Sequence, residues 1–594
     1  MNAVAVANRI ALQQLINAYL QETGRGCLIP VDEQTRAQLA LSGKHTLLWL
    51  CLEPFSITVA VPLEYASSVG RHRFASLPCI WRDYQWRQAS PVTLAALVLE
   101  DVVHNAENNL DASGLLERWV QSRDALAVFL KHRTERLDEL TQLQQSFKQS
   151  EQALLLGHNM HPASKSRQGF MHDEFLRYSP ETQGEFALHF WLVHPDILAE
   201  GHAEEGDISS LLCKSLLQAD AVPASALQTM AEYPQWKLLP LHPWQARFLM
   251  GQPLWRQLTA ASQAISLGAF GWTMHPTTSV RTLVSDAPWM FKPSLSVAIT
   301  NSVRINLAHE CLRGEISCRL WRSAFGVVLK EEFPTLAALN DPGWLGIKLN
   351  GQLVSESICI LRENPFTAYQ QITCMASLCQ DHPLTGRGRL HSILSALVQR
   401  TAQPAELVAM RWLERFLDIA VGPLLTLYAR YGMAFEAHQQ NTLLELDDLW
   451  PGRFWLRDNQ GFYYIRERAG RVLAQFPELG MQADSVGPES FVEERFIYYF
   501  FGNTLFGLIG ALGGTGLVDE GRLLYRLREF LHAHRQLNPG LIQALLSHDT
   551  LPFKGNLLTR LHGLDELVAP LDRQSVYVQV RNPLRETRTE VASA

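Results

Sequence analysis

The sequence predicts an α+β protein of several domains, and three observations carry this prediction. The chain has 594 residues, of which 47% are hydrophobic and only 19% are charged, so it can form the cores of three or four lobes. Residues 294–306 alternate between apolar and polar side chains, which is typical of a strand. Residues 405–431 instead place apolar side chains every three or four positions, which is typical of a helix.

These patterns divide the chain into three segments. Residues 1–155 mix short β-like runs with helices and end in a long charged helix over residues 115–155. Residues 156–400 are richer in β signals and Pro-centred turns, and we expect them to form a lobe around an antiparallel sheet. Residues 401–594 are mostly helical with a short β insertion, and Pro423 should kink or divide the helix in which it lies.

Charge and cysteine content exclude several classes of protein. The formal net charge of −7 argues against a nucleic-acid-binding protein, which needs a basic surface. The nine cysteines are scattered, odd in number and without a CxxC pair, which argues against a disulfide framework or a zinc ribbon. Residues 1–19 read as an amphipathic helix without the pattern of a signal peptide. We therefore predict a cytoplasmic location.

One apolar segment needs a separate interpretation. Residues 497–518 carry no charge and are long enough to span a bilayer. They include six glycines and lie deep inside a chain of otherwise soluble character. We interpret them as a buried helix followed by a Gly-rich turn, and we predict no membrane span. Because the glycines follow a helical pattern rather than a strand, they are a poor match to a dinucleotide-binding loop.

Four clusters of polar and charged side chains lie within apolar or Pro-rich stretches, where burying such side chains costs free energy. The first is a glycine-bounded loop at residues 157–170, which carries His158, Lys165 and Arg167. Such a loop can cradle an anion, although a solvated loop after a helix would look the same. It has neither the Walker A spacing nor the HExxH pattern of a zinc protease.

The second cluster joins Ser279, Arg281 and Thr282 to Lys292 and Arg304 on adjacent predicted strands. On an extended chain, Ser279 and Arg281 face the same side. Arginine supplies forked donors, lysine a point charge, and serine or threonine short hydrogen bonds, a combination that suits a polyphosphate. An ordinary exposed strand face is the alternative.

The third cluster consists of Glu436, His438 and Asn441, with Asp458 in a turn soon after. If residues 433–446 form a strand, Glu436 and His438 share one face of it. Carboxylate and amide oxygens are hard ligands that suit Mg²⁺ held jointly with substrate phosphates. The histidine between them could contact a carboxylate, and a hydrogen-bonded core histidine is the alternative.

The fourth cluster combines the HPWQ motif at residues 242–245 with Lys554. Proline at the first position of a helix explains much of the motif. Lys554 could face a substrate, although a surface position is the default for a lysine.

Taken together, the clusters resemble one enzyme family. Seven motifs follow one another between residues 155 and 560: GHxxHPxxKxRxGF, HPWQ, TxSxRT, KPSLxxxITNxxR, EAHxQN, RDxxG and KGNL. This order resembles that of the NRPS-independent siderophore synthetases, the type of the aerobactin and achromobactin synthetases. The first 150 residues match no motif of the family, and Gly555 stands where a small residue, often alanine, is expected.

The resemblance implies a fold described as thumb (1–155), fingers (156–400) and palm (401–594), with ATP between fingers and palm. It implies a reaction in which a carboxylate, usually of citrate, attacks the α-phosphorus of MgATP to give an acyl-adenylate and pyrophosphate. An amine or hydroxyl then attacks the adenylate and releases AMP. The resemblance also implies a homodimer.

Carried over to this sequence, the family's motifs imply roles for three sets of residues. The implied ATP contacts are His158, Lys165, Arg167, Ser279, Arg281, Thr282, Lys292 and Arg304. The implied ligands of Mg²⁺ are Glu436, Asn441 and Asp458. The implied contacts to the substrate carboxylate are Thr300, Asn301, His438 and Lys554, with His438 and Arg304 as catalytic residues.

Two other functions stay open at this point. A kinase-like phosphotransferase would use the same MgATP site, but the sequence lacks the HRD and DFG signatures and a Gly-rich loop over the phosphates. A non-catalytic protein that binds an anion or an iron chelate would need the cations but not the metal ligands. The sequence leaves open which acid and which nucleophile react.

Overall fold

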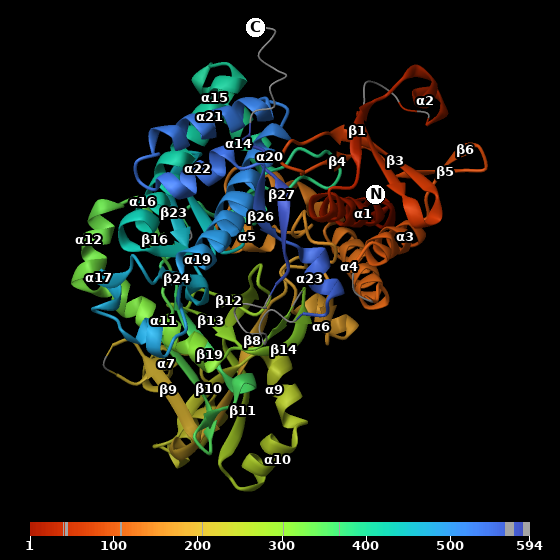
Figure 1. The fold of residues 1–594 in the computed structure, drawn as a ribbon. Helices are drawn as coiled ribbons and strands as arrows, with labels where there is room; N and C mark the ends of the chain where they lie inside the picture. Colours follow the sequence, from red (N-terminus) through yellow and green to blue (C-terminus); the bar gives the residue numbers. More distant parts are fainter. Residues whose placement is uncertain are drawn as a thin grey trace.

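The computed structural model describes residues 1–39, 41, 46–106, 110–204, 206–300, 302–367, 369–564 and 575–585. In Figure 1 the chain runs from an N-terminal lobe (red and orange) through a β-rich part (yellow and green) to a largely helical part (teal and blue). Near its end the chain returns to the first lobe, because helix α23 (Asn556–Leu561) packs on helix α1 (Ala3–Thr23).

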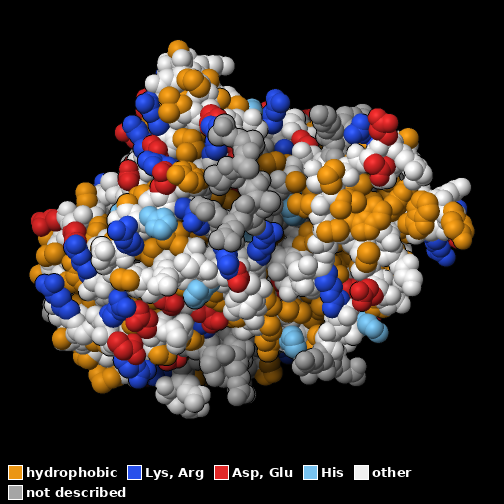
Figure 2. All heavy atoms as spheres, turned by 45° about the horizontal axis from the view of Figure 1, so that its top comes forward, with side chains coloured by type: hydrophobic (Ala, Val, Ile, Leu, Met, Phe, Trp, Pro, Cys, Tyr) orange, Lys and Arg blue, Asp and Glu red, His pale blue; other side chains and the backbone are white. Residues whose placement is uncertain are grey.

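The N-terminal lobe combines helices with a six-stranded antiparallel sheet, in the order β1-β2-β3-β5-β6 with β4 paired to β3. Its strands are β1 (Cys27–Pro30), β2 (Thr46–Leu52), β3 (Ile57–Tyr65), β4 (Arg73–Phe74), β5 (Cys79–Arg82) and β6 (Gln85–Gln88). Its further helices are α2 (Glu33–Gln38), α3 (Pro91–His104), α4 (Ser113–His132) and α5 (Phe147–Gln152). Figure 2 shows hydrophobic side chains gathered over one face of this lobe. Trp81 and Tyr84 are among the exposed hydrophobic side chains of the lobe.

The prediction of one long helix over residues 115–155 is wrong. Helix α4 ends at His132, and a 3₁₀ segment (Thr134–Thr141) and a loop separate it from α5. Arg133 accounts for the break, because its buried guanidinium donates to main-chain carbonyls of Gln152 and Glu181. A buried charge needs such partners, and the Arg133 guanidinium could not reach the Gln152 carbonyl if a single helix ran over residues 115–155.

The middle of the chain forms a nine-stranded sheet in the order β10-β8-β11-β12-β13-β19-β17-β18, with β9 paired to β17. Every pair in this sheet is antiparallel, as expected. Its strands are β8 (Phe186–Val193), β9 (Leu198–His202), β10 (Lys237–Leu241), β11 (Ala264–Pro276), β12 (Leu283–Val284), β13 (Trp289–Pro293), β17 (Gly343–Leu349), β18 (Gln352–Leu353) and β19 (Cys359–Glu363). The helices around it are α6 (His172–Arg177), α7 (Ile208–Gln218), α8 (Ala224–Glu232), α9 (Pro243–Met250) and α10 (Pro253–Ala260).

A small sheet beside it corrects the prediction of a single strand over residues 294–306. The segment is two antiparallel strands, β14 (Leu295–Ile299) and β15 (Ser302–Arg304), and β7 (Arg167–Gln168) pairs with β14. Thr300 lies at φ 54°, a conformation that β-branched residues rarely adopt. The alternation of apolar and polar residues therefore continues across the turn between β14 and β15, so it does not by itself indicate one strand.

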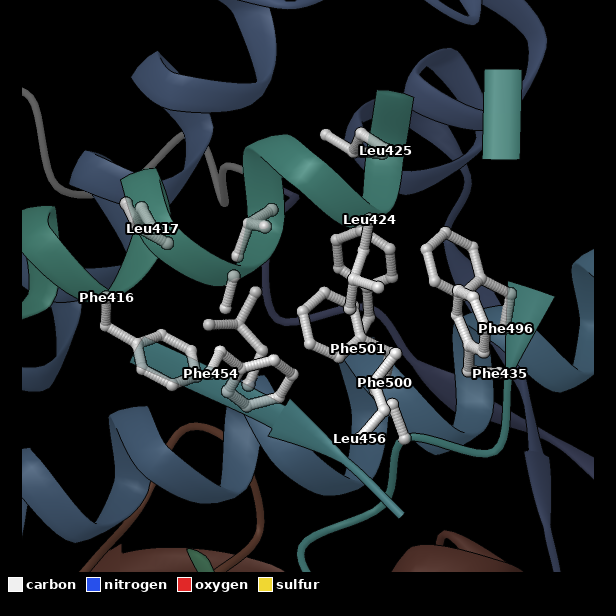
Figure 3. Close-up of a cluster of buried hydrophobic side chains, with 14 of the residues drawn as sticks. Phe416, Leu417, Leu424, Leu425, Phe435, Phe454, Leu456, Phe496, Phe500 and Phe501 are labelled. Atoms are coloured by element: carbon white, nitrogen blue, oxygen red, sulfur yellow. The ribbon is translucent and has the colours of Figure 1, made fainter. Parts of the chain in front are cut away.

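The largest core belongs to the C-terminal part, and Figure 3 shows its aromatic centre around Phe416, Phe454 and Phe500. Its helices are α11 (Ala308–Arg322), α12 (Ala324–Glu332), α13 (Met375–Leu378), α14 (Arg389–Thr401), α15 (Ala405–Phe416), α16 (Gly422–Tyr431), α17 (Gly470–Leu473), α18 (Glu478–Met481), α19 (Glu489–Phe496), α20 (Gly507–Gly513), α21 (Glu520–Ala533) and α22 (Pro539–Ser547). Its strands are β16 (Leu336–Ala338), β20 (Ile372–Cys374), β21 (Met433–Phe435), β22 (Thr442–Asp447), β23 (Trp450–Leu456), β24 (Phe462–Ile465), β25 (Val486–Gly487), β26 (Thr550–Lys554) and β27 (Tyr577–Arg581). This core also takes in side chains between Ile316 and Leu397, so a boundary at residue 400 stays a prediction.

Two π-helical stretches interrupt the long helices of this core. Leu417–Val421 separates α15 from α16 just before Pro423, as the sequence indicates. Ile497–Phe506 separates α19 from α20. The whole helix Glu489–Gly513 is long and apolar enough to cross a membrane, but 78% of its most apolar window is buried inside the protein. This burial agrees with its interpretation as a core helix.

Candidate active site

The middle and C-terminal parts of the chain enclose most of a cavity of about 700 Å³. Fourteen of the predicted site residues line it: His158, Lys165, Arg167, Ser279, Arg281, Thr282, Lys292, Thr300, Arg304, Glu436, His438, Asn441, Asp458 and Lys554. Asn301 lies outside the described residues. Residues up to 396 positions apart in the sequence thus meet in one place, although their roles stay predictions.

Lys292 and Asp458 form the central ion pair of the cavity. Lys292 lies on β13 with only 2% of its surface exposed, and its Nζ donates to Asp458 Oδ1 at 2.7 Å. Burial lowers the pKa of Lys292, and the negative charge of Asp458 opposes that shift. Burial would raise the pKa of Asp458, but the charges of Lys292 and Arg362 outweigh it and hold that pKa well below its usual range.

Arg281 and Arg304 lie beside this pair. Arg281 Nη1 donates to the Arg304 carbonyl at 3.1 Å and to Asn306 Oδ1 at 2.8 Å. Arg304 Nη2 donates to Thr300 Oγ1 at 3.0 Å. Both side chains line the cavity.

The segment that carries Ser279, Arg281 and Thr282 is a turn between β11 and β12, which corrects the prediction of an extended strand. Val280 lies at φ 68°, and Ser279 Oγ accepts from the Thr282 amide at 3.1 Å. The buried Glu151 carboxylate fixes the turn by accepting from the main chain of Thr278 at 2.9 Å.

Lys165 and Arg167 are paired with a carboxylate that sequence reasoning missed. Glu181 accepts from Lys165 Nζ at 2.5 Å and from Arg167 Nη2 at 2.6 and 2.8 Å. Burial would raise the pKa of Glu181, but the charges of Arg167 and Lys165 outweigh it and lower the pKa to about 2. The loop therefore presents far less free positive charge than its sequence indicates.

Glu436 and His438 lie in the loop between β21 and β22, and the prediction of a strand over residues 433–446 is wrong there. The π-helical stretch holds this loop, because Asn503 Oδ1 accepts from the Gln439 amide at 2.9 Å and Thr504 donates to the Ala437 carbonyl at 2.6 Å. Both Glu436 and His438 still face the cavity.

Glu436, Asn441 and Asp458 fit a divalent cation that is held jointly with substrate phosphates, rather than one enclosed by protein ligands alone. Burial raises the pKa of Glu436, whose carboxylate accepts from the Tyr463 hydroxyl. Gly461 makes room for it, since a Cβ there would lie 2.6 Å from Glu436 Cβ. Within the described residues no group of three or more His, Cys, Asp or Glu side chains could hold a metal. One or two carboxylates plus phosphate oxygens suffice for Mg²⁺, so Glu436, Asn441 and Asp458 fit that ion.

His438 is a neutral imidazole. Burial, with smaller contributions from the neighbouring His158 and Lys554, lowers its pKa to about 3. A neutral ring can accept a proton from a reacting amine.

Lys554 is placed by the N-terminal lobe. It ends β26 directly before α23, and Glu22 of α1 accepts from the amides of Leu557 and Leu558 at 2.8 and 2.9 Å. A Cβ on Gly555 would lie 2.7 Å from Glu22 Oε2, which explains why glycine replaces the alanine expected here. Nothing in the sequence around Glu22 indicates this contact.

Comparisons with known proteins agree with the geometry. Residues 146–380 match the model of the IucA / IucC family. The chain is 36% identical to the rhizobactin siderophore biosynthesis protein RhbC of Rhizobium meliloti, over 90% of this chain and 92% of that protein. The chain belongs to the IucA/IucC family of NRPS-independent siderophore synthetases.

Further members of the family extend the likeness to the full length. A spermidine-citrate ligase of Bacillus anthracis is 32% identical over 98% of both chains. The structure of ATP-bound aerobactin synthetase IucA from Klebsiella pneumoniae has a TM-score of 0.87 at 27% identity and covers 97% of this chain and 100% of its own. Residues 410–569 also match the model described as ferric iron reductase FhuF-like transporter, but they contain no cysteine that could ligate an iron–sulfur cluster.

Proposed function

We propose that this siderophore synthetase activates a carboxylate of citrate with ATP and condenses it with an amine or hydroxyl nucleophile, releasing AMP and pyrophosphate. The observation that carries the proposal is the single cavity in which Arg281, Lys292 and Arg304 face Glu436 and Asp458. Relatives named as citrate ligases and an ATP-bound structural neighbour support it.

Charge drives the first step. A carboxylate that attacks a triphosphate brings two anions together, and fixed cations must offset their repulsion. Arg281, Lys292 and Arg304 supply them, with Ser279 and Thr282 donating short hydrogen bonds to phosphate oxygens. Lys165 and Arg167, being paired with Glu181, chiefly fix the loop that carries His158 beside the nucleotide.

Glu436, Asn441 and Asp458 would hold Mg²⁺, which when bound supplies further positive charge to the phosphates. Lys292 contacts Asp458 at 2.7 Å, so a residue that would hold the metal and a residue that would contact the phosphates lie side by side.

The second step needs an oriented acyl group and a deprotonated amine. Thr300 and Lys554 contact the substrate carboxylates, and Arg304 stabilises the charge that develops on the reacting carbonyl. His438, which burial keeps neutral, faces the acyl group as a hydrogen-bond acceptor for the attacking amine and is the candidate to take its proton as the new bond forms.

We further propose that the three segments correspond to the thumb, fingers and palm of the family, with division near residues 155 and 400. We also propose that the enzyme is cytoplasmic and acts as a homodimer. Sedimentation of the purified protein tests the dimer, since a single species of monomer mass would contradict it.

Product analysis tests the reaction. With citrate, MgATP and hydroxylamine we expect AMP and pyrophosphate in equal amounts. Release of ADP and phosphate, or of ADP with a phosphorylated product, would contradict the adenylate and favour the kinase-like alternative.

Variants test the site. Lys292→Ala should lower turnover by about 10²–10³-fold, as for other groups that stabilise developing charge, whereas the exposed Lys330→Ala should match the wild type. Asp458→Ala should abolish turnover and retain ATP binding. Unchanged function in Asp458→Ala would instead favour a non-catalytic anion-binding protein.

A further inference from the structure

A buried ion pair adjoins the active-site cavity and takes no part in the proposed reaction. Arg457 lines the cavity with only 6% of its side chain exposed, and Glu151, fully buried near the end of helix α5, lies behind it. Arg457 Nη1 donates to Glu151 Oε1 at 2.8 Å. Burying two charges costs free energy unless their donors and acceptors find partners. The other contacts of the pair therefore indicate what it holds in place.

Glu151 holds the turn that carries the predicted phosphate contacts. Its Oε2 accepts from the amide and from the hydroxyl of Thr278, both at 2.9 Å. The turn also has hydrogen bonds of its own, from the Thr277 amide to the Thr282 carbonyl at 2.9 Å and from the Thr282 amide to Ser279 Oγ at 3.1 Å. Glu151 therefore determines where the turn lies more than the shape that it adopts.

Arg457 holds the segments that carry two of the predicted ligands of Mg²⁺. Its Nε donates to the Gln440 carbonyl at 2.8 Å, and its main-chain amide donates to the Asn441 carbonyl at 3.0 Å. Asp458 follows it directly in the chain. Its Nη2 also donates to the Thr278 hydroxyl at 3.1 Å. One side chain thus contacts both the loop of Asn441 and the turn that carries the phosphate contacts.

Helix α5 gives this arrangement a fixed base in the C-terminal part. The hydroxyl of Ser150, next to Glu151, accepts from the Cys374 amide at 2.9 Å, and the Ser150 carbonyl accepts from the Ser377 hydroxyl at 2.7 Å. These contacts attach the helix to β20 and α13. The Glu151 carboxylate is therefore held with the metal-binding side of the cavity, and the turn between β11 and β12 is tied to it.

We propose that Glu151 and Arg457 are positioning residues that keep the turn at Thr278 where one MgATP can contact both it and the pair Asn441 and Asp458. The inference rests on the proposed function. An ion that is held jointly by protein oxygens and phosphates needs both sets of ligands in place. When the ion pair is broken, the turn keeps its own hydrogen bonds and still binds phosphates, but the metal no longer reaches both sides. Mg²⁺ should then strengthen ATP binding less than it does in the wild type.

Titration calorimetry with ATP, without citrate so that no condensation occurs, measures the dissociation constant in Mg²⁺ and in EDTA. The ratio of the EDTA constant to the Mg²⁺ constant should fall about tenfold in Glu151→Gln and in Thr278→Val, as for other residues that orient metal ligands. Thr278→Val exchanges a hydroxyl for a methyl group and removes no charge, so it decides the test if Glu151→Gln folds poorly. Thr278→Ser restores the hydroxyl and should recover most of the ratio. The matched changes Glu185→Gln and Thr93→Val, both at exposed positions, should leave the ratio unchanged.

The ratio separates a positioning role from a purely structural one. Equal losses of ATP affinity in Mg²⁺ and in EDTA would leave the ratio unchanged and would overturn the inference, because the pair would then serve only the stability of the fold. Wild-type affinities in both variants, or a wild type whose ATP affinity does not depend on Mg²⁺, would overturn it as well. Each of these results leaves the proposed function standing if the wild type releases AMP with citrate and hydroxylamine. A wild type that binds no ATP would overturn the proposed function and this inference together.

Discussion

Replacing Glu181 by glutamine should destabilise the protein strongly, because it leaves two buried cations without their partner. The Glu181 side chain is 2% exposed, and those of Lys165 and Arg167 are 5% and 3% exposed. All three lie at the wall of the active-site cavity. Glutamine preserves the shape and one acceptor but removes the charge.

Two estimates of the cost agree. Breaking a buried ion pair by removing one partner costs about 3–5 kcal/mol. A pKa lowered from 4.5 to about 2 corresponds to about 3 kcal/mol of stability, at 1.36 kcal/mol per pKa unit. Because the pKa is depressed in the folded state, this stability is present above pH 4.5 and is lost as the pH falls toward 2.

Urea denaturation of wild type and Glu181→Gln at pH 7.5, followed by tryptophan fluorescence, measures the difference. Glu185→Gln, at an exposed glutamate four residues away, is the matched control and should stay within about 0.5 kcal/mol of the wild type. A loss below 1 kcal/mol in Glu181→Gln would refute the reasoning, and Lys165 and Arg167 would then be free to bind phosphate as the sequence indicates.

Three further predictions concern backbone fit, the N-terminal lobe and acid stability. Gly461→Ala, whose Cβ would lie 2.6 Å from Glu436 Cβ, should lower turnover at least tenfold with an unchanged circular dichroism spectrum; full activity would contradict a tight fit there. Glu22→Ala removes the acceptor of two amides in the first turn of α23 and should lower the free energy of unfolding by about 1–2 kcal/mol. Urea denaturation measures the loss, and a variant as stable as the wild type would contradict the importance of this contact. Burial lowers the pKa of His242 to about 3, so stability present above pH 6.5 should fall by about 2 kcal/mol at pH 5. His242→Asn, which can still cap α9, should lose this contribution of His242 to the pH dependence, and an identical pH dependence in both proteins would contradict the assignment.

The residues that line the cavity could be predicted from the sequence because burying a polar or charged side chain costs free energy. Charged side chains such as Lys292 and Arg304 within apolar, strand-like stretches need a reason to be there, and the order of the motifs supplied one. The antiparallel character of the middle sheet and the division of a helix before Pro423 follow from equally local signals.

What could not be predicted are the partners and the reversals of the chain. Glu181 and Glu22 become visible only when folding brings them to Lys165 and to α23, because no short-range pattern links them to the site. The turn at Val280 and the reversal at Thr300 put β-branched residues at positive φ, against their preference, so alternation alone predicted extended strands. Tertiary contacts, such as that of Glu151 with the turn, override the local tendency.

Helix α23 completes the core of the N-terminal lobe, which is made well before it. Leu557 and Leu561 lie among buried side chains of the first 163 residues, and the hydrogen bond from Leu557 to Glu22 spans 535 positions. At synthesis rates of about 5–20 residues per second, the roughly 400 residues between this lobe and α23 take about 20 to 80 seconds to make. Throughout that interval the apolar side chains that later pack against α23 are uncovered, so the nascent chain offers chaperones a binding surface that is buried in the finished enzyme.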